Sequence, residues 1–496
     1  MNHGIIFNLG TEPSGMTART VGAYRIASIL RENNWDIEVI DFFNGFTDIE
    51  LDLLINSRIS QRTKFIGISW LFSDDNKKLR LFLDNLKSKY PNLIVLSGSN
   101  QKLDYRYDSI DYHVYGYGEN ALLKLMKYLF SNETRPHFDI NTNGERTKSL
   151  NANNYPSFPM PNLTTRYEKR DYLLSDEFLG FQTARGCIFQ CSFCQFPNIG
   201  VKEDYTRSHQ SFEEELRENY DLWGIKNYII ADETFNDRSD KIIKYANVVE
   251  RLNFSPWFSA FIRPELLFTR KSDCEHLIRM GVLGHFYGVD SLNKETRKLI
   301  FKGYDPDKLK TKLLDTIDYF RKNNDTFVST ASFIVGLPKE NLESLNDTKE
   351  WLKKYWKNDH AIFFPLYISI GKNARKSKID LNYEEYGYDK LIEERSGKHF
   401  DGLSDRVVQG NENNVLFWKN EYMNFFEAGD IADNMFHEVF NESNKVNELF
   451  ALGAFSLTGS PKERILSGEL MHHWTYNLDI NLERVNSYKQ KKLAFV

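Results

Sequence analysis

Three of the four cysteines in the chain lie within eight residues, at a spacing that suits metal chemistry. Cys187, Cys191 and Cys194 form a Cys-x3-Cys-x2-Cys motif, whereas Cys274 lies far away in the sequence. So few cysteines argue against a disulfide framework, and three close thiolates favour a soft metal centre. Because a cubane iron–sulfur cluster uses four protein ligands, three would leave one iron open to a small molecule.

Two other interpretations of these cysteines compete with a cluster. A structural zinc site needs a fourth Cys or His, which Cys274 or His276 could supply, although the spacing is unusual for a zinc finger. The cysteines could also be inert residues of the core. The flanking Arg185-Gly186 and the Gln-Phe-Pro segment at 195–197 are instead typical of a loop.

The motif resembles the cluster loop of the radical S-adenosylmethionine (radical SAM) superfamily. The resemblance rests on the cysteine spacing, on the preceding Arg185-Gly186 and on Phe193 just before the third cysteine. It implies a 4Fe-4S cluster bound by all three cysteines, with the open iron chelated by the amino and carboxylate groups of SAM. An electron from a reductase or a flavodoxin-type donor would cleave SAM and yield a 5′-deoxyadenosyl radical, which abstracts hydrogen from an unactivated carbon.

The sequence around the motif predicts a barrel. Strand-like runs alternate with helical patterns over residues 176–375, which favours a partial (β/α)6 TIM-like barrel. The cysteines directly follow its first strand, and barrel chemistry lies at the carboxyl ends of strands. The expected strands are 179–184, 226–231, 256–262, 284–289, 327–335 and 361–368. The expected helices are 211–222, 239–252, 273–280, 294–300, 306–321 and 341–355.

Residues just beyond the later strands are the SAM ligands that the resemblance implies. Asp232 and Glu233 resemble the region that contacts the SAM amino group, and Arg263 would meet the carboxylate. Asp290 and Ser291 stand where the superfamily often has Glu-Ser, and Asp290 is one methylene shorter.

Phe193 and Gly336 complete the implied SAM contacts. Gly336 begins a Gly-Leu-Pro-Lys-Glu segment that resembles the superfamily's Gly-Leu-Pro-x-Glu, where the backbone approaches the adenine. Structural explanations remain open for each residue. The acidic string after the second strand and Ser291 could cap helices, Arg263 could pair with Glu265, and a strand-to-helix turn itself favours Gly-Leu-Pro.

The first 135 residues predict a separate Rossmann-like, doubly wound parallel sheet. The expected strands are 4–9, 36–41, 64–70, 92–97 and 111–115. The expected helices are 18–33, 76–89 and 119–130. Ligands bind such sheets beyond the carboxyl ends of their strands.

This amino-terminal region resembles the cobalamin-binding domain that is often fused in front of radical SAM barrels. The resemblance rests on Ser69 and Leu71 after the third strand, on Ser97 and Gly98 after the fourth, and on the Gly-Tyr-Gly-Glu turn at 116–119. The loop 10–15 lacks the family's Asp-x-His-x-x-Gly, and the histidines at positions 3 and 113 are poorly placed. Cobalamin would therefore bind without a histidine ligand; the alternative is a scaffold sheet that binds no corrin.

Two further regions frame these domains. Residues 136–175 are rich in Asn, Pro, Thr and charge, which predicts a linker. Residues 376–496 predict a helical domain, with helices near 414–440 and 444–455 that we expect to close over the barrel.

Composition excludes several classes of protein. The chain has 496 residues, 41% of them hydrophobic, and a net charge of −5, so it does not favour nucleic-acid or membrane binding. No window of about 18 apolar residues predicts a membrane span. The first residues resemble a strand rather than a signal peptide, so we expect a cytoplasmic protein.

The expected activity combines these parts. The resemblance implies a radical SAM enzyme that transfers a methyl group from cobalamin to an unactivated carbon. One alternative is a cobalamin-independent radical SAM rearrangement or oxidation, and another is a non-catalytic zinc-binding scaffold. A small molecule, a peptide or a nucleotide all remain open as the substrate.

Overall fold

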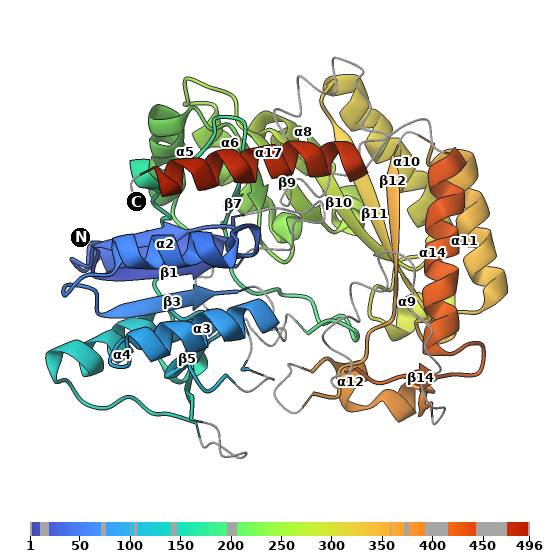
Figure 1. The fold of residues 1–496 in the computed structure, drawn as a ribbon. Helices are drawn as coiled ribbons and strands as arrows, with labels where there is room; N and C mark the ends of the chain where they lie inside the picture. Colours follow the sequence, from blue (N-terminus) through green and yellow to red (C-terminus); the bar gives the residue numbers. More distant parts are fainter. Residues whose placement is uncertain are drawn as a thin grey trace.

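Two six-stranded parallel sheets organise the protein (Figure 1). The computed structural model describes residues 2–9, 19–70, 76–100, 102–103, 107–139, 146–195, 206–357, 359–371, 376–391, 415–442 and 474–494. Within these residues, the first sheet belongs to the amino-terminal part of the chain and the second to its centre.

The first sheet has the order β2-β1-β3-β4-β5-β6, with every strand parallel. Its central strands are short apolar runs, as parallel strands covered on both faces require. The chain reverses its direction of winding between β1 and β3, where such sheets bind ligands beyond their carboxyl ends. The strands are β1 (Gly4–Asn8), β2 (Ile37–Ile40), β3 (Phe65–Ser69), β4 (Ile94–Ser99), β5 (Tyr112–Tyr115) and β6 (Lys148–Asn151).

The helices of this sheet are α1 (Val21–Glu32), α2 (Asp48–Arg58), α3 (Lys77–Lys89) and α4 (Glu119–Ser131). The Rossmann-like sheet is confirmed, with two elements beyond those expected. Helix α2 begins at a capping box between Thr47 and Glu50. Strand β6 lies in the segment 136–175, for which the sequence predicts a linker, and it pairs with β5.

The second sheet follows chain order, β12-β11-β10-β9-β8-β7, and all its strands are parallel. β7 and β12 form its two edges, so the expected partial (β/α)6 barrel is confirmed as an open one. Its strands are β7 (Phe178–Phe181), β8 (Asn227–Ile230), β9 (Trp257–Ile262), β10 (Val282–Asp290), β11 (Val328–Val335) and β12 (His360–Pro365).

Helices separate these strands and cover the outside of the barrel (Figure 1). Each expected helix is present, and a short helix, α7, is added after β9. The helices are α5 (His209–Trp223), α6 (Ser239–Val249), α7 (Pro264–Thr269), α8 (Ser272–Met280), α9 (Lys294–Leu299), α10 (Pro306–Asn323) and α11 (Leu342–Tyr355).

The described helices of the carboxyl-terminal region pack on different parts of the molecule. α12 (Lys378–Leu381) lies near the cysteine loop, since the Ile379 amide donates to the Ser192 carbonyl at 2.9 Å. α14 (Phe425–Glu442) packs against β12 and α11 at the barrel edge. α17 (Trp474–Leu493) instead lies along α2 of the amino-terminal sheet (Figure 1). The expected helix near 444–455 lies outside the described residues.

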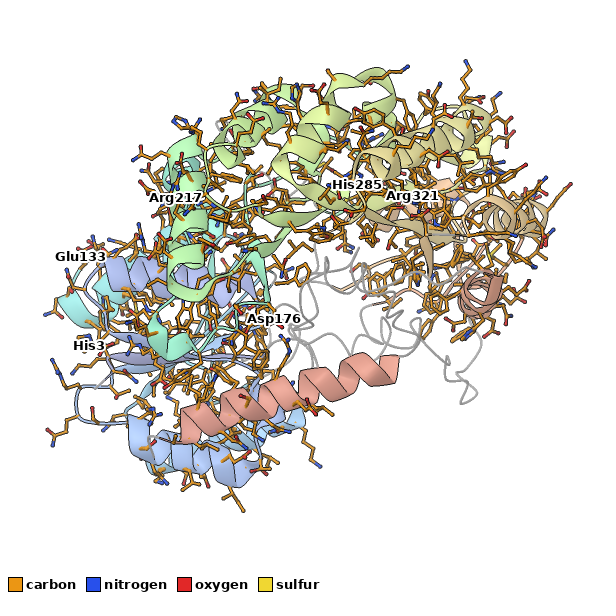
Figure 2. All side chains as sticks on the ribbon, turned by 90° about the horizontal axis from the view of Figure 1, so that it is seen from above. His3, Glu133, Asp176, Arg217, His285 and Arg321 are labelled. Carbon is orange, nitrogen blue, oxygen red and sulfur yellow. The ribbon has the colours of Figure 1, made fainter. Side chains whose placement is uncertain are left out.

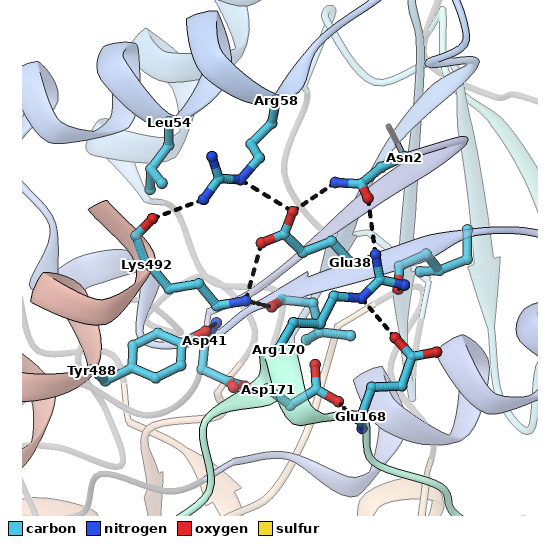
Figure 3. A network of polar contacts seen from close by, with 12 residues as sticks. Asn2, Glu38, Asp41, Leu54, Arg58, Glu168, Arg170, Asp171, Tyr488 and Lys492 are labelled. Atoms are coloured by element: carbon cyan, nitrogen blue, oxygen red, sulfur yellow. Dashed lines mark hydrogen bonds and ion pairs between the residues drawn. The ribbon is translucent and has the colours of Figure 1, made fainter. Parts of the chain in front are cut away.

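A polar network fastens α17 to the amino-terminal sheet (Figure 3). Lys492 Nζ contacts Glu38 Oε1 at 3.1 Å, and the Tyr488 hydroxyl accepts a hydrogen bond from the Asp41 amide at 2.9 Å. Arg484 pairs with Asp176, which lies between the two sheets (Figure 2). α17 therefore joins the amino-terminal sheet to the start of the barrel.

Arg19 is the centre of a second part of this network. Its guanidinium pairs with Asp41 at the end of β2 and with Glu177 just before β7, the latter at 2.7 Å. It also lies 5.0 Å from the Tyr488 ring. The Arg19 side chain is 2% exposed, so it links both sheets and α17 away from solvent.

Among the described helices, none combines the length and apolar character that a membrane-spanning segment requires.

Candidate functional site

The three cysteines of the motif line one cavity of about 150 Å³. The cavity lies at the carboxyl ends of β8, β9 and β10, where barrel chemistry is expected. Each of the three thiols is partly exposed. The other lining residues are Phe189, Phe193, Glu233, Thr234, Phe261, Ile262, Arg263, Phe286, Gly288, Asp290 and Lys302.

Asp232 fixes the start of the cysteine loop. Its carboxylate accepts hydrogen bonds from the amides of Thr183 and Ala184 at 2.8 and 3.0 Å, and from the Thr183 hydroxyl. Asp232 is 1% exposed and does not line the cavity. The structure therefore places this expected SAM ligand behind the loop, where it orients the residues that precede Cys187.

Further contacts fix the middle of the loop. The Cys194 amide donates to the Cys191 carbonyl at 3.1 Å, which closes a turn. The Ser192 hydroxyl donates to the Leu299 carbonyl at 3.0 Å. These bonds hold the part of the loop from which Cys191 and Cys194 line the cavity.

Two cations lie beside Cys191. Arg263 Nη1 is 3.7 Å from Cys191 Sγ, and its guanidinium lies 4.1 Å from the centre of the Phe189 ring. Lys302 Nζ contacts Asp290 Oδ2 at 2.8 Å. Burial raises the pKa of the Cys191 thiol, whereas Lys302 and Arg263 act in the opposite direction. Positive charge thus favours the thiolate that a metal ligand must supply.

The donor set fits a cluster better than a zinc ion. Cys274 is 6% exposed in α8 and packs in the main core, so it does not line the cavity. His276 Nδ1 lies 2.8 Å from Arg279 Nη1 on the same helix. Among the described residues, no three His, Cys, Asp or Glu side chains are arranged to bind a single metal ion. Three thiols without a fourth ligand suit a cluster with one open iron.

Glu233 offers an acceptor inside the cavity. Its Oε1 accepts a hydrogen bond from the Tyr117 hydroxyl at 3.1 Å, so the contact comes from the amino-terminal sheet. Its Oε2 is buried with no hydrogen-bond partner in the described part of the chain. Burial raises the pKa of this carboxyl group. Of the two expected acidic ligands, Glu233 therefore faces the cavity and Asp232 does not.

The remaining expected SAM residues divide into two groups. Phe193, Arg263 and Asp290 line the cavity, whereas Ser291 and Gly336 do not. Instead, their contacts converge on a buried carboxylate outside the cavity.

That carboxylate is Glu340, the last residue of the Gly-Leu-Pro-Lys-Glu segment. Its Oε1 accepts from the Ser291 hydroxyl at 2.7 Å, and its Oε2 accepts from the Gly336 amide at 3.0 Å. Gly336 has φ +89°, and a Cβ there would collide with the Trp418 indole. Glu340 therefore ties the end of β10 to the end of β11 at a position where only glycine fits.

Burial raises the pKa of Glu340 to about 7. Since this folded-state pKa exceeds the unfolded one, ionised Glu340 costs stability above pH ~4.5, and the cost grows until about pH 7. We expect Glu340→Gln to raise the free energy of unfolding relative to the wild type more at pH 8 than at pH 5. Urea unfolding at pH 5 and at pH 8 measures the free energy of unfolding of the variant and of the wild type. An equal difference between the two proteins at both pH values would contradict the effect of burial on the Glu340 pKa.

The expected cobalamin residues lie at the carboxyl edge of the first sheet. Ser69 ends β3, and Ser97 and Gly98 lie near the end of β4. Leu71 and the loop 10–15 lie outside the described residues. Ser97 Oγ is 2.8 Å from Nδ1 of the buried His113. This ring nitrogen is therefore hydrogen-bonded to the neighbouring strand.

Sequence patterns alone do not identify Lys302, Tyr117 and Glu119 as residues of this site. Lys302 reaches the cavity from the segment after α9, and no local pattern marks it. The Gly-Tyr-Gly-Glu turn does mark Tyr117 and Glu119, although only as part of the resemblance to a cobalamin-binding domain.

A larger groove of about 920 Å³ lies elsewhere, at the amino ends of the first sheet's strands. Trp35, Lys64, Lys89, Tyr90 and Phe130 are among its lining residues. Parallel sheets bind ligands at their carboxyl ends, and no cysteine lines this groove. We therefore place the functional site at the smaller cavity.

Comparisons with known proteins agree with this assignment. Residues 181–352 match the Radical SAM superfamily. The ribosomal protein uS12 methylthiotransferase RimO of Carboxydothermus hydrogenoformans is 24% identical over 270 residues, which are 51% of this chain and 59% of that protein. The chain thus matches less than two thirds of the length of that relative.

Two solved structures share the fold. One is the radical S-adenosylmethionine methyltransferase TsrM from Kitasatospora setae, with cobalamin and a [4Fe-4S] cluster bound. It is 13% identical, with a TM-score of 0.64 over 98% of this chain and 100% of that one. The other is the cobalamin-dependent S-adenosylmethionine radical enzyme OxsB, 18% identical, with a TM-score of 0.52 over 78% of this chain and 56% of that one.

The match extends from the end of β7 into α11, and it includes the cysteine loop and the strand ends around the cavity. Residues 181–352 are therefore similar to the Radical SAM superfamily, and this segment follows an amino-terminal Rossmann-like sheet.

Proposed function

We propose that the protein is a cobalamin-dependent radical SAM methyltransferase that methylates an unactivated carbon. The observation that carries the proposal is the meeting of the two sheets' carboxyl ends beside the three cysteines. Tyr117, in the turn after β5, donates a hydrogen bond to Glu233, which lies in the loop after β8 and lines the same cavity as the thiols. A cofactor on the first sheet would thus lie next to a cluster on the second.

The bound groups would supply the reactive chemistry. A 4Fe-4S cluster with SAM would provide a 5′-deoxyadenosyl radical, and cobalamin would provide a transferable methyl group. Cys187, Cys191 and Cys194 would ligate the cluster, with the cation of Arg263 offsetting the charge on the thiolates. The electron would come from a reductase or flavodoxin-type donor.

The cavity residues would bind and orient SAM. Glu233 Oε2 lacks a partner and could accept a hydrogen bond from the amino group of SAM. Arg263 lines the cavity and could pair with the carboxylate of SAM, although it also lies 3.6 Å from Glu265, whereas Lys302 is paired with Asp290. Phe189, Phe261 and Phe286 line the same cavity and would exclude water from the reacting atoms.

One observation keeps a corrin-free radical SAM activity as a second candidate. His113 is bonded to Ser97, and His3 lines the groove at the opposite end of the first sheet. Neither histidine is therefore placed to ligate cobalt. We propose the cobalamin-dependent activity because binding without a protein histidine remains compatible with a Rossmann-like sheet.

Anaerobic reconstitution separates these candidates. We expect purified protein to be brown, to contain about four irons per chain, and to release 5′-deoxyadenosine from SAM under a strong reductant. Gel filtration after incubation with hydroxocobalamin should leave a corrin spectrum on the protein. Iron and deoxyadenosine without retained corrin would favour the corrin-free activity, and colourless, iron-free protein would refute both.

A further inference from the structure

The turn between β5 and α4 crosses from the amino-terminal sheet to the cluster cavity. Glu119, the first residue of α4, pairs with Arg185 through both carboxylate oxygens, one of them 3.1 Å from Arg185 Nη1. Arg185 lies two residues before Cys187, the first cysteine of the loop. The two side chains are 3% and 2% exposed, so the pair is shielded from solvent.

Tyr117 contacts one residue of the cysteine loop and one residue of the loop after β8. Its ring lies 4.2 Å from the guanidinium carbon of Arg185, and its hydroxyl donates to Glu233 Oε1 at 3.1 Å. A single side chain from the turn after β5 thus contacts Arg185, near the start of the cysteine loop, and Glu233, the acceptor inside the cavity.

The electrostatics favour a fixed geometry here. Burial alone would raise the pKa of Glu119, but Arg185 and Arg25 lower it to about 2. Arg25 Nε, on α1, lies 3.4 Å from Glu119 Oε1. Glu119 therefore stays ionised between two arginines, and a displaced Arg185 would leave a buried charge without its partner.

We infer that Tyr117 and Glu119 are positioning residues of the cluster site. Tyr117 restrains Glu233 and leaves its second oxygen directed at a ligand, and Glu119 fixes Arg185 and the start of the cysteine loop. The amino-terminal sheet thereby sets the geometry of the SAM cavity, and a ligand that moves the β5–α4 turn changes the affinity for SAM. The inference rests on the proposed function only where its test measures SAM binding.

The test compares Tyr117→Phe with Tyr115→Phe in the full chain. The first variant keeps the ring over Arg185 and removes the hydroxyl that donates to Glu233. The second removes a bond of the same kind from the last residue of β5, where the Tyr115 hydroxyl donates to Asp139 Oδ2 at 2.6 Å. Tyr115 contacts neither Glu233 nor Arg185 through that hydroxyl, so it controls for general loss of stability.

Two readouts follow the position of Glu233. In reconstituted protein with equal iron content, SAM titrated against the electron paramagnetic resonance spectrum of the reduced cluster should bind about three- to tenfold more weakly to Tyr117→Phe, the effect of one hydrogen bond. In cluster-free protein, hydrogen exchange of residues 231–238 should be faster in the same variant. Tyr115→Phe should match the wild type in both measurements.

A second variant tests the other contact. Glu119→Gln keeps the shape of the side chain and removes its charge, and we expect faster exchange over residues 182–190. Wild-type behaviour of both variants would overturn the inference, as would equal losses in Tyr115→Phe and Tyr117→Phe. If the wild-type protein bound no cluster, the proposed function would fail, yet the exchange comparison would still decide the positioning role.

Discussion

Cys191→Ala should abolish cluster assembly and the release of 5′-deoxyadenosine from SAM while leaving the fold largely intact. Cys191 lines the cavity beside Arg263, and its thiolate is one of three that would ligate the cluster. Loss of a residue that only supports a metal ligand lowers metal affinity or activity about 10–100-fold. Loss of a ligand itself should therefore cause a larger decrease. Iron analysis and chromatography of the reaction products measure both effects.

Cys274→Ala is the matched control, because Cys274 is the one cysteine of the sequence outside the motif. It is buried in α8, so we expect a modest loss of stability and normal iron content. Deoxyadenosine release by Cys191→Ala at the wild-type rate would contradict the ligand assignment. Iron loss in Cys274→Ala with an unchanged melting temperature would show instead that the fourth cysteine takes part.

Arg19→Met should lower the free energy of unfolding by about 3–5 kcal/mol, the cost of removing one partner from a buried ion pair. Arg19 compensates Asp41 and Glu177, and all three side chains are at most 2% exposed. In the variant, these two carboxylates would stay buried without the cation that compensates their charge.

Urea unfolding followed by circular dichroism measures this loss, with Arg166→Met as the control. Arg166 pairs with Glu218 at 2.5 Å, but the two side chains are 43% and 28% exposed. Exposed pairs contribute about 0–1 kcal/mol, so this control should change little. Equal losses in the two variants would refute a special role for the buried network.

The sequence predicts the strands of both sheets well because most are apolar runs bounded by turn residues. It misses α2, whose buried side chains are limited to Leu51, Leu54 and Ile55 among charged neighbours. It also misses β6, whose residues Lys148–Asn151 lack a long apolar run and add to the edge of the sheet beside β5. Both elements depend on tertiary packing more than on their own pattern.

The site could be predicted only in part for a similar reason. The cysteine spacing is local, so the motif can be recognised without the fold. Asp232 and Glu233 are neighbours, yet one faces the loop backbone and the other the cavity, and the sequence cannot assign these directions. Lys302 reaches the cavity from a distant segment, and Tyr117 reaches Glu233 from the other sheet, so only the folded chain brings them together.

The position of α17 has a consequence for biosynthesis. Asp41 and Glu38 leave the ribosome 447 and 454 residues ahead of the α17 groups that contact them. During translation these acidic residues lack Tyr488 and Lys492, so the first sheet completes its packing only after the barrel has been made. A nascent or truncated amino-terminal half should therefore expose this face to chaperones until the final helix arrives.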